Sequence, residues 1–363
     1  MNRRAALFAA VMCAVALSLP ATAAAATKLV YAGSPPGLKQ LAAKVLGKRV
    51  QALGREAPGI NAFSNQTVTI HQGDSVKWVG LAANFHTVDL PAKGGADLPL
   101  FVAGQKVTGV NDSAGSPFWF NGLVPSLGFN PKLFKPSGGF TYSGASRIDT
   151  GLPVSPHSSN TLKVKFTKPG VYRYFCDVHP GMIGYVVVRP KGKSVPTAKQ
   201  DAAALTKHLT TDILAADKLI KVKQPADHVS LGMSTPQGVE LYAMFPATLS
   251  VKAGTAVTFS ISAHSREVHT ASFGPASYLN TLSASLNSPV FDQQALYPSS
   301  NPQLGPIQLS PASHGNGFAS TGGLDRDPTT PAMPSEQIDF TTPGVYHFQC
   351  LIHPFMKGTI IVN

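Results

Sequence analysis

The chain contains the same 23-residue segment twice. Residues 166–188 read FTKPGVYRYFCDVHPGMIGYVVV, and residues 340–362 read FTTPGVYHFQCLIHPFMKGTIIV, with twelve identical positions and no gap. Each copy holds Cys-x-x-His-x-x-Met ahead of a β-branched run: Cys176, His179 and Met182, then Cys350, His353 and Met356. This repeat constrains the fold strongly, because both halves of the chain must build equivalent structures around equivalent side chains.

The donor atoms in each copy indicate copper. A thiolate, an imidazole and a thioether form a soft ligand set that suits copper better than magnesium or calcium. A second imidazole would complete a trigonal plane with Met as a weak axial ligand, which is the geometry of copper electron-transfer sites. His86 in NFHTVDL and His269 in EVHTASF are the candidates. His264 is the alternative in the second half, and His269 is preferred because Thr follows the His in both segments.

The strand pattern predicts an all-β chain of two domains. Residues 67–79, TVTIHQGDSVKWV, match residues 248–260, TLSVKAGTAVTFS, and both indicate two strands joined by a Gly-containing turn. The full length of 363 residues also favours two domains. We therefore expect two Greek-key β-sandwiches, at residues 27–195 and 225–363.

Helices are expected in two places and long insertions in two others. Residues 37–56 have apolar positions at helical spacing, which predicts an extra N-terminal helix. Residues 196–224 are amphipathic and followed by Pro225, which predicts a helical linker between the domains. Insertions at about 91–157 and 275–337 separate each remote His from its Cys loop, and we expect them to cover the copper edge or form a docking face.

The N-terminus predicts export. Arg3 and Arg4 precede an apolar stretch and several small residues, so residues 1–26 are expected to be a signal peptide. A periplasmic or extracellular location follows, and no later apolar run is long enough for a transmembrane segment. Two cysteines then remain, Cys176 and Cys350, and metal ligation explains their equivalent positions better than a disulfide between the two copies.

The charge favours acidic partners. The formal net charge is +12, of which the two signal arginines contribute two. Such a balance steers a protein towards acidic redox partner proteins or anionic surfaces. Nucleic-acid binding is not expected, since the chain is predicted to be exported and shows no recognised nucleic-acid-binding motif.

Both halves resemble cupredoxins of the plastocyanin/azurin superfamily, and the ligand loops most resemble amicyanin, above all in YHFQCLIHPFMKGTIIV. The resemblance is close over about 20 residues in each half and loose over the upstream strands. It implies two type 1 copper sites, with His86, Cys176, His179 and Met182 as ligands of one and His269, Cys350, His353 and Met356 as ligands of the other. It also implies a blue copper one-electron carrier. One departure is Thr87 and Thr270, where many members have an Asn that braces the Cys loop.

Two alternatives stay open beside this non-enzymatic carrier. Two-domain copper nitrite reductases and small laccases need extra imidazoles, but this chain has no His-x-His or His-Cys-His, and Pro91 and Gly274 occupy the places of the catalytic His of nitrite reductases. His264 near His269 leaves an opening for an additional metal. Copper storage or delivery proteins use Met-rich or Cys-rich runs, whereas only Met182 and Met356 of the chain's 7 Met stand with other ligands.

The ligand loops also predict where a partner docks. Each ligand His is followed by Pro180 or Pro354 and, in the second half, by Phe355. At the end of a β-sandwich we expect the His edge to lie close to solvent, within an apolar patch that a redox partner can approach.

Overall fold

The computed structural model describes residues 25–53, 59–154, 159–327, 330 and 332–363. The predicted signal peptide, except its last two residues, lies outside this range. Within the described residues, every helix is too short or too polar to cross a membrane.

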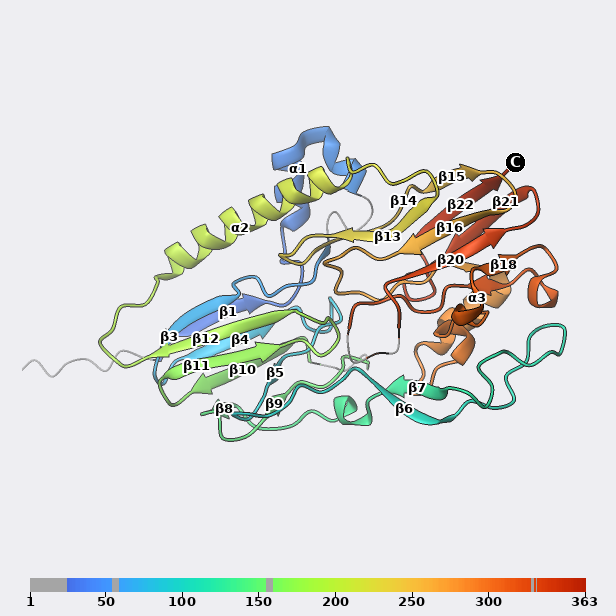
Figure 1. Cartoon of the computed structure of the whole chain (residues 1–363). Coiled ribbons are helices and arrows are strands. Elements are labelled where there is room, and N and C mark those ends of the chain that lie inside the picture. Colours follow the sequence, from blue (N-terminus) through green and yellow to red (C-terminus); the bar gives the residue numbers. More distant parts are fainter. Residues whose placement is uncertain (1–24, 54–58, 155–158, 328–329, 331) are drawn as a thin grey trace, which may run out of the picture.

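The first sandwich packs a four-stranded sheet against a five-stranded one (Figure 1). The four-stranded sheet has the order β1 (Thr27–Tyr31), β4 (Ser75–Val79), β10 (Thr161–Phe166) and β8 (Thr141–Tyr142). The five-stranded sheet has the order β3 (Thr67–His71), β12 (Ile183–Arg189), β11 (Gly170–Phe175), β5 (Asp89–Leu90) and β9 (Ile148–Asp149). Trp78 and Tyr174 come from opposite sheets and meet in the core with their ring centroids 5.0 Å apart.

The second sandwich repeats this topology. Its first sheet has the order β18 (Ile307–Leu309), β20 (Ser335–Phe340), β16 (Thr255–Ser260), β13 (His228–Ser234), β14 (Val239–Phe245) and β2 (Gly59–Ile60). Its second sheet has the order β15 (Thr248–Val251), β22 (Lys357–Val362), β21 (Gly344–Gln349), β17 (Ser272–Phe273) and β19 (Ala319–Ser320). Every strand of the first sandwich has a counterpart here with the same pairing, and β14 and β2 are additions.

The alternation of apolar and polar residues explains how the two sheets of each sandwich close on one core. In β3 the residues at every second position, Val68 and Ile70, are buried and their neighbours are more exposed. The Gly-containing turn after β3 leads into β4 in the opposite sheet, so this connection crosses the sandwich and is not a hairpin. The predicted all-β sandwich fold is confirmed.

The first two helices lie together on one side of the molecule, and the second of them joins the two sandwiches (Figure 1). α1 (Leu38–Leu46) ends at Gly47, which has φ 59°, and a 3-10 segment, η1 (Gly47–Leu53), continues the chain. α2 (Ala198–Leu219) begins with a capping box formed by Thr197 and Gln200. The apolar faces of α1 and α2 pack together with β13 and β14, so the N-terminal helix lies against the second sandwich (Figure 1).

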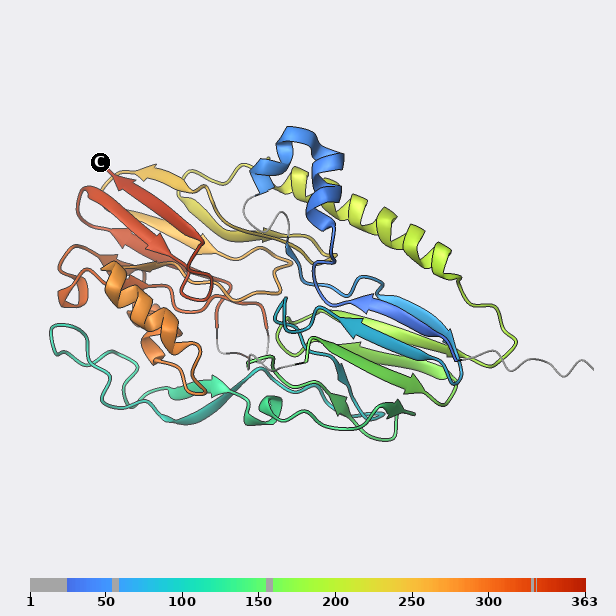
Figure 2. The same ribbon diagram turned by 180° about the vertical axis from the view of Figure 1, so that it is seen from behind.

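The two predicted insertions contact each other. The first contains the ribbon β6 (Phe101–Lys106) and β7 (Pro125–Phe129) and the 3-10 turn η2 (Pro131–Phe134). The second contains α3 (Ala276–Ser285) and the 3-10 turns η3 (Gln293–Ala295), η4 (Pro302–Leu304) and η5 (Ser313–Gly315). Figure 2 shows the β6–β7 ribbon running beside α3 under the second sandwich. Each insertion also returns two short strands to its own sandwich: β8 and β9 in the first, β18 and β19 in the second.

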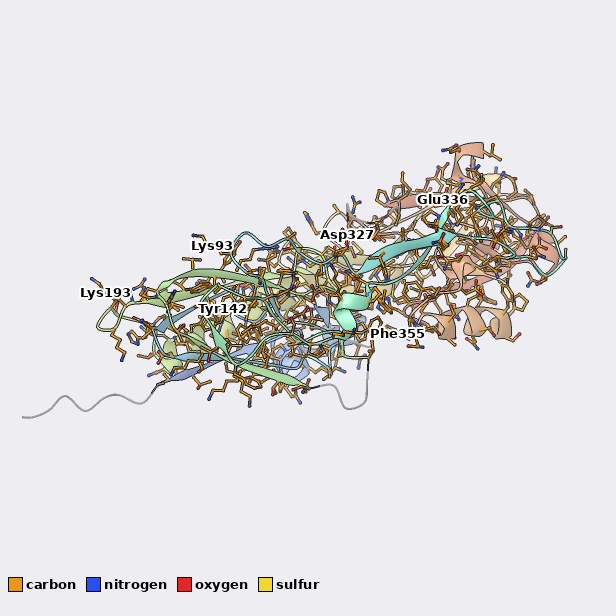
Figure 3. All side chains as sticks on the ribbon, turned by 90° about the horizontal axis from the view of Figure 1, so that it is seen from below. Lys93, Tyr142, Lys193, Asp327, Glu336 and Phe355 are labelled. Atoms are coloured by element: carbon orange, nitrogen blue, oxygen red, sulfur yellow. The ribbon has the colours of Figure 1, made fainter. Side chains whose placement is uncertain are left out.

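Polar contacts fix this docking of one insertion on the other. The buried Gln293 side chain accepts a hydrogen bond from the Leu127 N–H at 2.8 Å and donates one to the Leu127 carbonyl at 3.2 Å. Trp119 donates to the Pro298 carbonyl at 2.7 Å. The ligand loop of the second half lies in the middle of the molecule, where Figure 3 labels Phe355.

Candidate metal centres

The structure brings three predicted ligands of the first half together. The Sγ of Cys176 lies 3.7 Å from Nδ1 of His86 and 3.5 Å from Nδ1 of His179, and the two Nδ1 atoms are 2.9 Å apart. All three residues are buried. The donor atoms therefore converge on one point, at which a single ion can contact all of them.

The second half repeats this arrangement. The Sγ of Cys350 lies 3.8 Å from Nδ1 of His269 and 3.8 Å from Nδ1 of His353, and these two Nδ1 atoms are 3.2 Å apart. His269 occupies the place of His86, whereas His264 is exposed and belongs to neither donor group. The structure thus brings His269, and not His264, to Cys350 and His353.

The short ligand loops connect β11 to β12 and β21 to β22. In the first, the Cys176 N–H donates to the Met182 carbonyl at 3.0 Å, and the Met182 N–H donates to the His179 carbonyl at 3.0 Å. The equivalent two bonds in the second loop are 3.0 and 2.8 Å long. Met182 and Met356 are buried in the cores at the end of each loop. A thiol and two imidazoles that converge on one point, with a buried Met at the end of the same loop, are a donor set that suits copper.

Each remote histidine is held against a glycine. Gly33 has φ 80°, and a Cβ there would lie 2.4 Å from Nε2 of His86. Gly232 has φ 79° and faces Nε2 of His269 in the same way, with a Cβ at 3.0 Å. Since glycine alone tolerates both the backbone conformation and the close approach, these positions set the orientation of both imidazoles.

Threonine braces both Cys loops. The Oγ1 of Thr87 accepts a hydrogen bond from the Asp177 N–H at 2.8 Å, and the Oγ1 of Thr270 accepts one from the Leu351 N–H at 2.9 Å. The backbone N–H of each Thr also points at the Cys sulfur, at 3.4 Å in both halves. The departure from the expected Asn therefore preserves a brace on the Cys loop.

Electrostatics favour the thiolate in both groups. Burial opposes ionisation of Cys176, but hydrogen bonding and charge from His179 and His86 hold the pKa of this thiol well below its usual range. The pKa of Cys350 is lowered in the same way by His269 and His353. Burial likewise opposes the charge on His179, yet the Glu267 carboxylate and Cys176 raise its pKa to about 10. A thiolate is the form that binds a metal.

Glu267 is a polar residue of this region that the sequence analysis missed. Its Oε1 lies 3.1 Å from Nε2 of His179, and its Oε2 lies 3.6 Å from Nε2 of His353. Burial opposes ionisation of this carboxyl, but the facing histidines hold its pKa far below its usual range. Glu267 is therefore a carboxylate. The sequence feature that could have revealed Glu267 is an acidic residue two positions before His269, where the first half has Asn84.

A cavity of about 700 Å³ opens beside Glu267 and reaches ligand histidines of both halves. Its wall includes His86, His179 and His353, and the rest is largely apolar, with Phe129, Phe291 and Leu286 from the two insertions. The expectation that the ligand His lies close to solvent is wrong for His179, which is only 5% exposed because it faces the second half. The His353 side chain keeps 18% of its surface exposed.

The two centres differ in the charge around them. Asp89, Asp149 and Asp177 form a buried cluster beside Cys176, and Arg147 pairs with Asp89. The strand pairing places Ser272 and Ser320 at the positions of Asp89 and Asp149 in the second half, and Leu351 replaces Asp177. The second half instead has Glu240, whose Oε1 lies 4.0 Å from Nε2 of His269.

Comparison with known proteins finds similarity over part of the chain. No family model matches it. A segment of 53 residues, 14% of this chain, is 38% identical to amicyanin-alpha of Methylorubrum extorquens and covers 44% of that protein. The chain thus spans less than half the length of this relative.

Several solved structures resemble parts of the chain. Oxidised plastocyanin from Dryopteris crassirhizoma is 24% identical, with 38% of this chain and 99% of that chain covered and a TM-score of 0.21. A purple cupredoxin from Nitrosopumilus maritimus is 15% identical, with 38% and 98% covered and a TM-score of 0.20. A Cu(I) amicyanin variant is also 15% identical, with 39% and 87% covered and a TM-score of 0.22.

Proposed function

We propose that this protein is an exported blue copper protein that carries single electrons, with one type 1 copper site in each half. The two congruent groups of His, Cys and His carry this proposal, because each joins a low-pKa thiolate to two imidazole Nδ1 atoms within one buried pocket. Homology to amicyanin over part of the chain supports it. The ligands of the first site are His86, Cys176, His179 and Met182, and those of the second are His269, Cys350, His353 and Met356.

The residues around each site suit rapid electron transfer. Bound copper supplies the one-electron couple. The buried sandwich ends hold the donor atoms in one arrangement for both oxidation states, so little needs to move when an electron arrives. The Thr braces and the glycines behind the remote histidines maintain that arrangement. The domains are taken as residues 27–195 and 225–363, joined by the linker at 196–224.

Copper titration of the protein without its signal segment tests the proposal. We expect two equivalents of Cu(II) to bind with an intense visible band, and Cys176→Ser and Cys350→Ser each to remove about half of that absorbance. Each substitution removes the charge-transfer donor of one site only. Loss of the whole band in one variant and none in the other would show that a single site is real.

A copper oxidoreductase is the second candidate, and the cavity beside the ligand histidines favours it. A small aromatic reductant could reach both centres there, since ligand pockets of this size are commonly lined by apolar and aromatic side chains. Against it, the described residues contain only two donor groups with histidine, and both are the predicted electron-transfer sites. Steady turnover of a phenol or of nitrite by the loaded protein would favour the enzyme, whereas stoichiometric reduction without turnover would favour the carrier.

A further inference from the structure

Glu267 lies between the two proposed copper sites and contacts a ligand histidine of each. Because Nδ1 of both His179 and His353 faces the Cys sulfur, Nε2 is the polar atom that points away from the site. Those two Nε2 atoms meet opposite oxygens of one carboxylate, at 3.1 and 3.6 Å. The first distance is within hydrogen-bond range, and the second is a longer ion-pair contact.

The carboxylate is held firmly in this place. Tyr242 in β14 donates a hydrogen bond to Oε1 at 2.6 Å, and Asn61, which follows β2, donates one at 2.7 Å. The Glu267 side chain keeps only 8% of its surface exposed. A buried charge with four polar contacts from both halves has few alternative orientations.

We propose that Glu267 is the relay through which an electron passes between the two copper sites and through which each site senses the oxidation state of the other. This inference rests on the proposed function. One site is oxidised from Cu(I) to Cu(II) as the other is reduced from Cu(II) to Cu(I), so one electron moves. No proton needs to move, because the carboxylate faces both imidazole Nε2 atoms before and after the transfer.

Tyr242 strengthens the contact on the side of the longer distance. Its ring centroid lies 5.1 Å from that of His353, while its hydroxyl binds Glu267. The second site is therefore joined to the carboxylate both directly and through Tyr242. His179 is buried away from outside partners, and its 3.1 Å contact joins the first site to the Glu267 carboxylate. Electrons for the first site then arrive by way of the second, whose His353 retains an exposed edge.

The shared charge predicts that Glu267 acts on both reduction potentials. A carboxylate beside a ligand imidazole stabilises the oxidised, more positive site. Its removal in Glu267→Gln raises the potentials of both sites. Glu240→Gln is the matched control, since it removes a buried carboxylate beside His269 alone and raises only the second potential.

Flash reduction of the copper-loaded protein tests the relay. Met356→Leu is introduced into every sample, because loss of the axial thioether separates the potential and the spectrum of the second site from those of the first. We expect an exchange phase, in which an electron moves from one copper site to the other at a rate that does not depend on protein concentration. It slows about tenfold or more in Glu267→Gln, the range for losing a residue that orients metal ligands, and is retained in Glu240→Gln.

Two further measurements do not depend on the rate of electron transfer between the sites, and the first keeps Met356→Leu so that each potential can be assigned to its site. Spectroelectrochemical titration gives both potentials in each variant. NMR of the Cu(I) protein shows the Nε2 protons of His179 and His353. We expect the His179 proton to be hydrogen-bonded and both protons to shift in Glu267→Gln. If both blue sites form but the exchange phase and both potentials are unchanged in Glu267→Gln, the relay is wrong. If two blue sites do not form in the parent protein, the proposed function fails instead.

Discussion

At the scale of single residues, Thr87 and Thr270 brace the Cys loops at the positions where many cupredoxins have an Asn. Each hydroxyl oxygen accepts the backbone N–H of the residue after the ligand Cys, and so holds the Cys loop to the strand segment that carries the remote His. A different side chain reaches the same backbone group, because the hydroxyl lies directly opposite it.

Substitution of Thr87 by Val tests this brace with almost no change in shape. The buried Asp177 N–H loses its acceptor, which costs about 1–3 kcal/mol. We expect copper affinity at the first site to fall about tenfold to a hundredfold, as for other groups that support metal ligands. Competition with a chelator measures it. Thr270→Val should weaken the second site only, and unchanged affinity in both variants would exclude the brace.

Asp177 should make the first site sensitive to pH. Burial and the neighbouring Asp149 raise the pKa of this carboxyl to about 8. It is therefore mostly protonated at neutral pH and ionises as the pH rises through that value, placing a negative charge beside Cys176. Negative charge stabilises the oxidised site, so its reduction potential should fall as the pH rises past 8.

Protein-film voltammetry across this pH range checks the expectation. Asp177→Asn should remove the pH dependence, and the second site, where Leu351 occupies the equivalent position, should not show it. If the reduction potentials of both sites changed equally with pH, a group other than Asp177 would be responsible.

At the scale of elements, the repeat made the sandwiches predictable but gave no information on how the insertions pack. Strands β11 and β12 and their counterparts follow from a duplicated pattern, and the ligand loops follow from their spacing. α1 was predicted too long, because Gly47 ends the α-helix after Leu46 and a 3-10 segment follows. The packing of the insertions depends on contacts such as Gln293 with Leu127, 166 residues apart, for which the chain has no repeated signal.

Gln293→Leu tests how much that docking contributes to stability. The substitution introduces an apolar side chain of similar size and leaves the Leu127 N–H and carbonyl without their partner. We expect a loss of about 1–3 kcal/mol in the free energy of unfolding, from urea denaturation of the metal-free protein. Gln303→Leu, at an exposed position of the same insertion, should change it by less than about 0.5 kcal/mol. Equal effects of the two substitutions would show that the contact between Gln293 and Leu127 does not stabilise the docking of the two insertions.

At the scale of the whole molecule, the two candidate centres face each other across Glu267. Sequence reasoning named the ligand candidates of each half but expected the His edges to face solvent, as in a single sandwich. It could not place one half against the other, because that placement depends on Asn61, Tyr242 and Glu267, which lie outside the repeat. Residues 206 positions apart form the contact between Asn61 and Glu267.

Each half is proposed to hold one copper ion, with Glu267 between the two. Anomalous X-ray scattering at the copper edge, from crystals of the loaded protein, tests this proposal most directly. We predict two copper peaks of equal height, one within bonding distance of Cys176, His86 and His179, the other of Cys350, His269 and His353, with the Glu267 carboxylate between the two ligand loops. A single peak, or a copper ion held by Asp89, Asp149 and Asp177 instead of Cys176, would contradict the account.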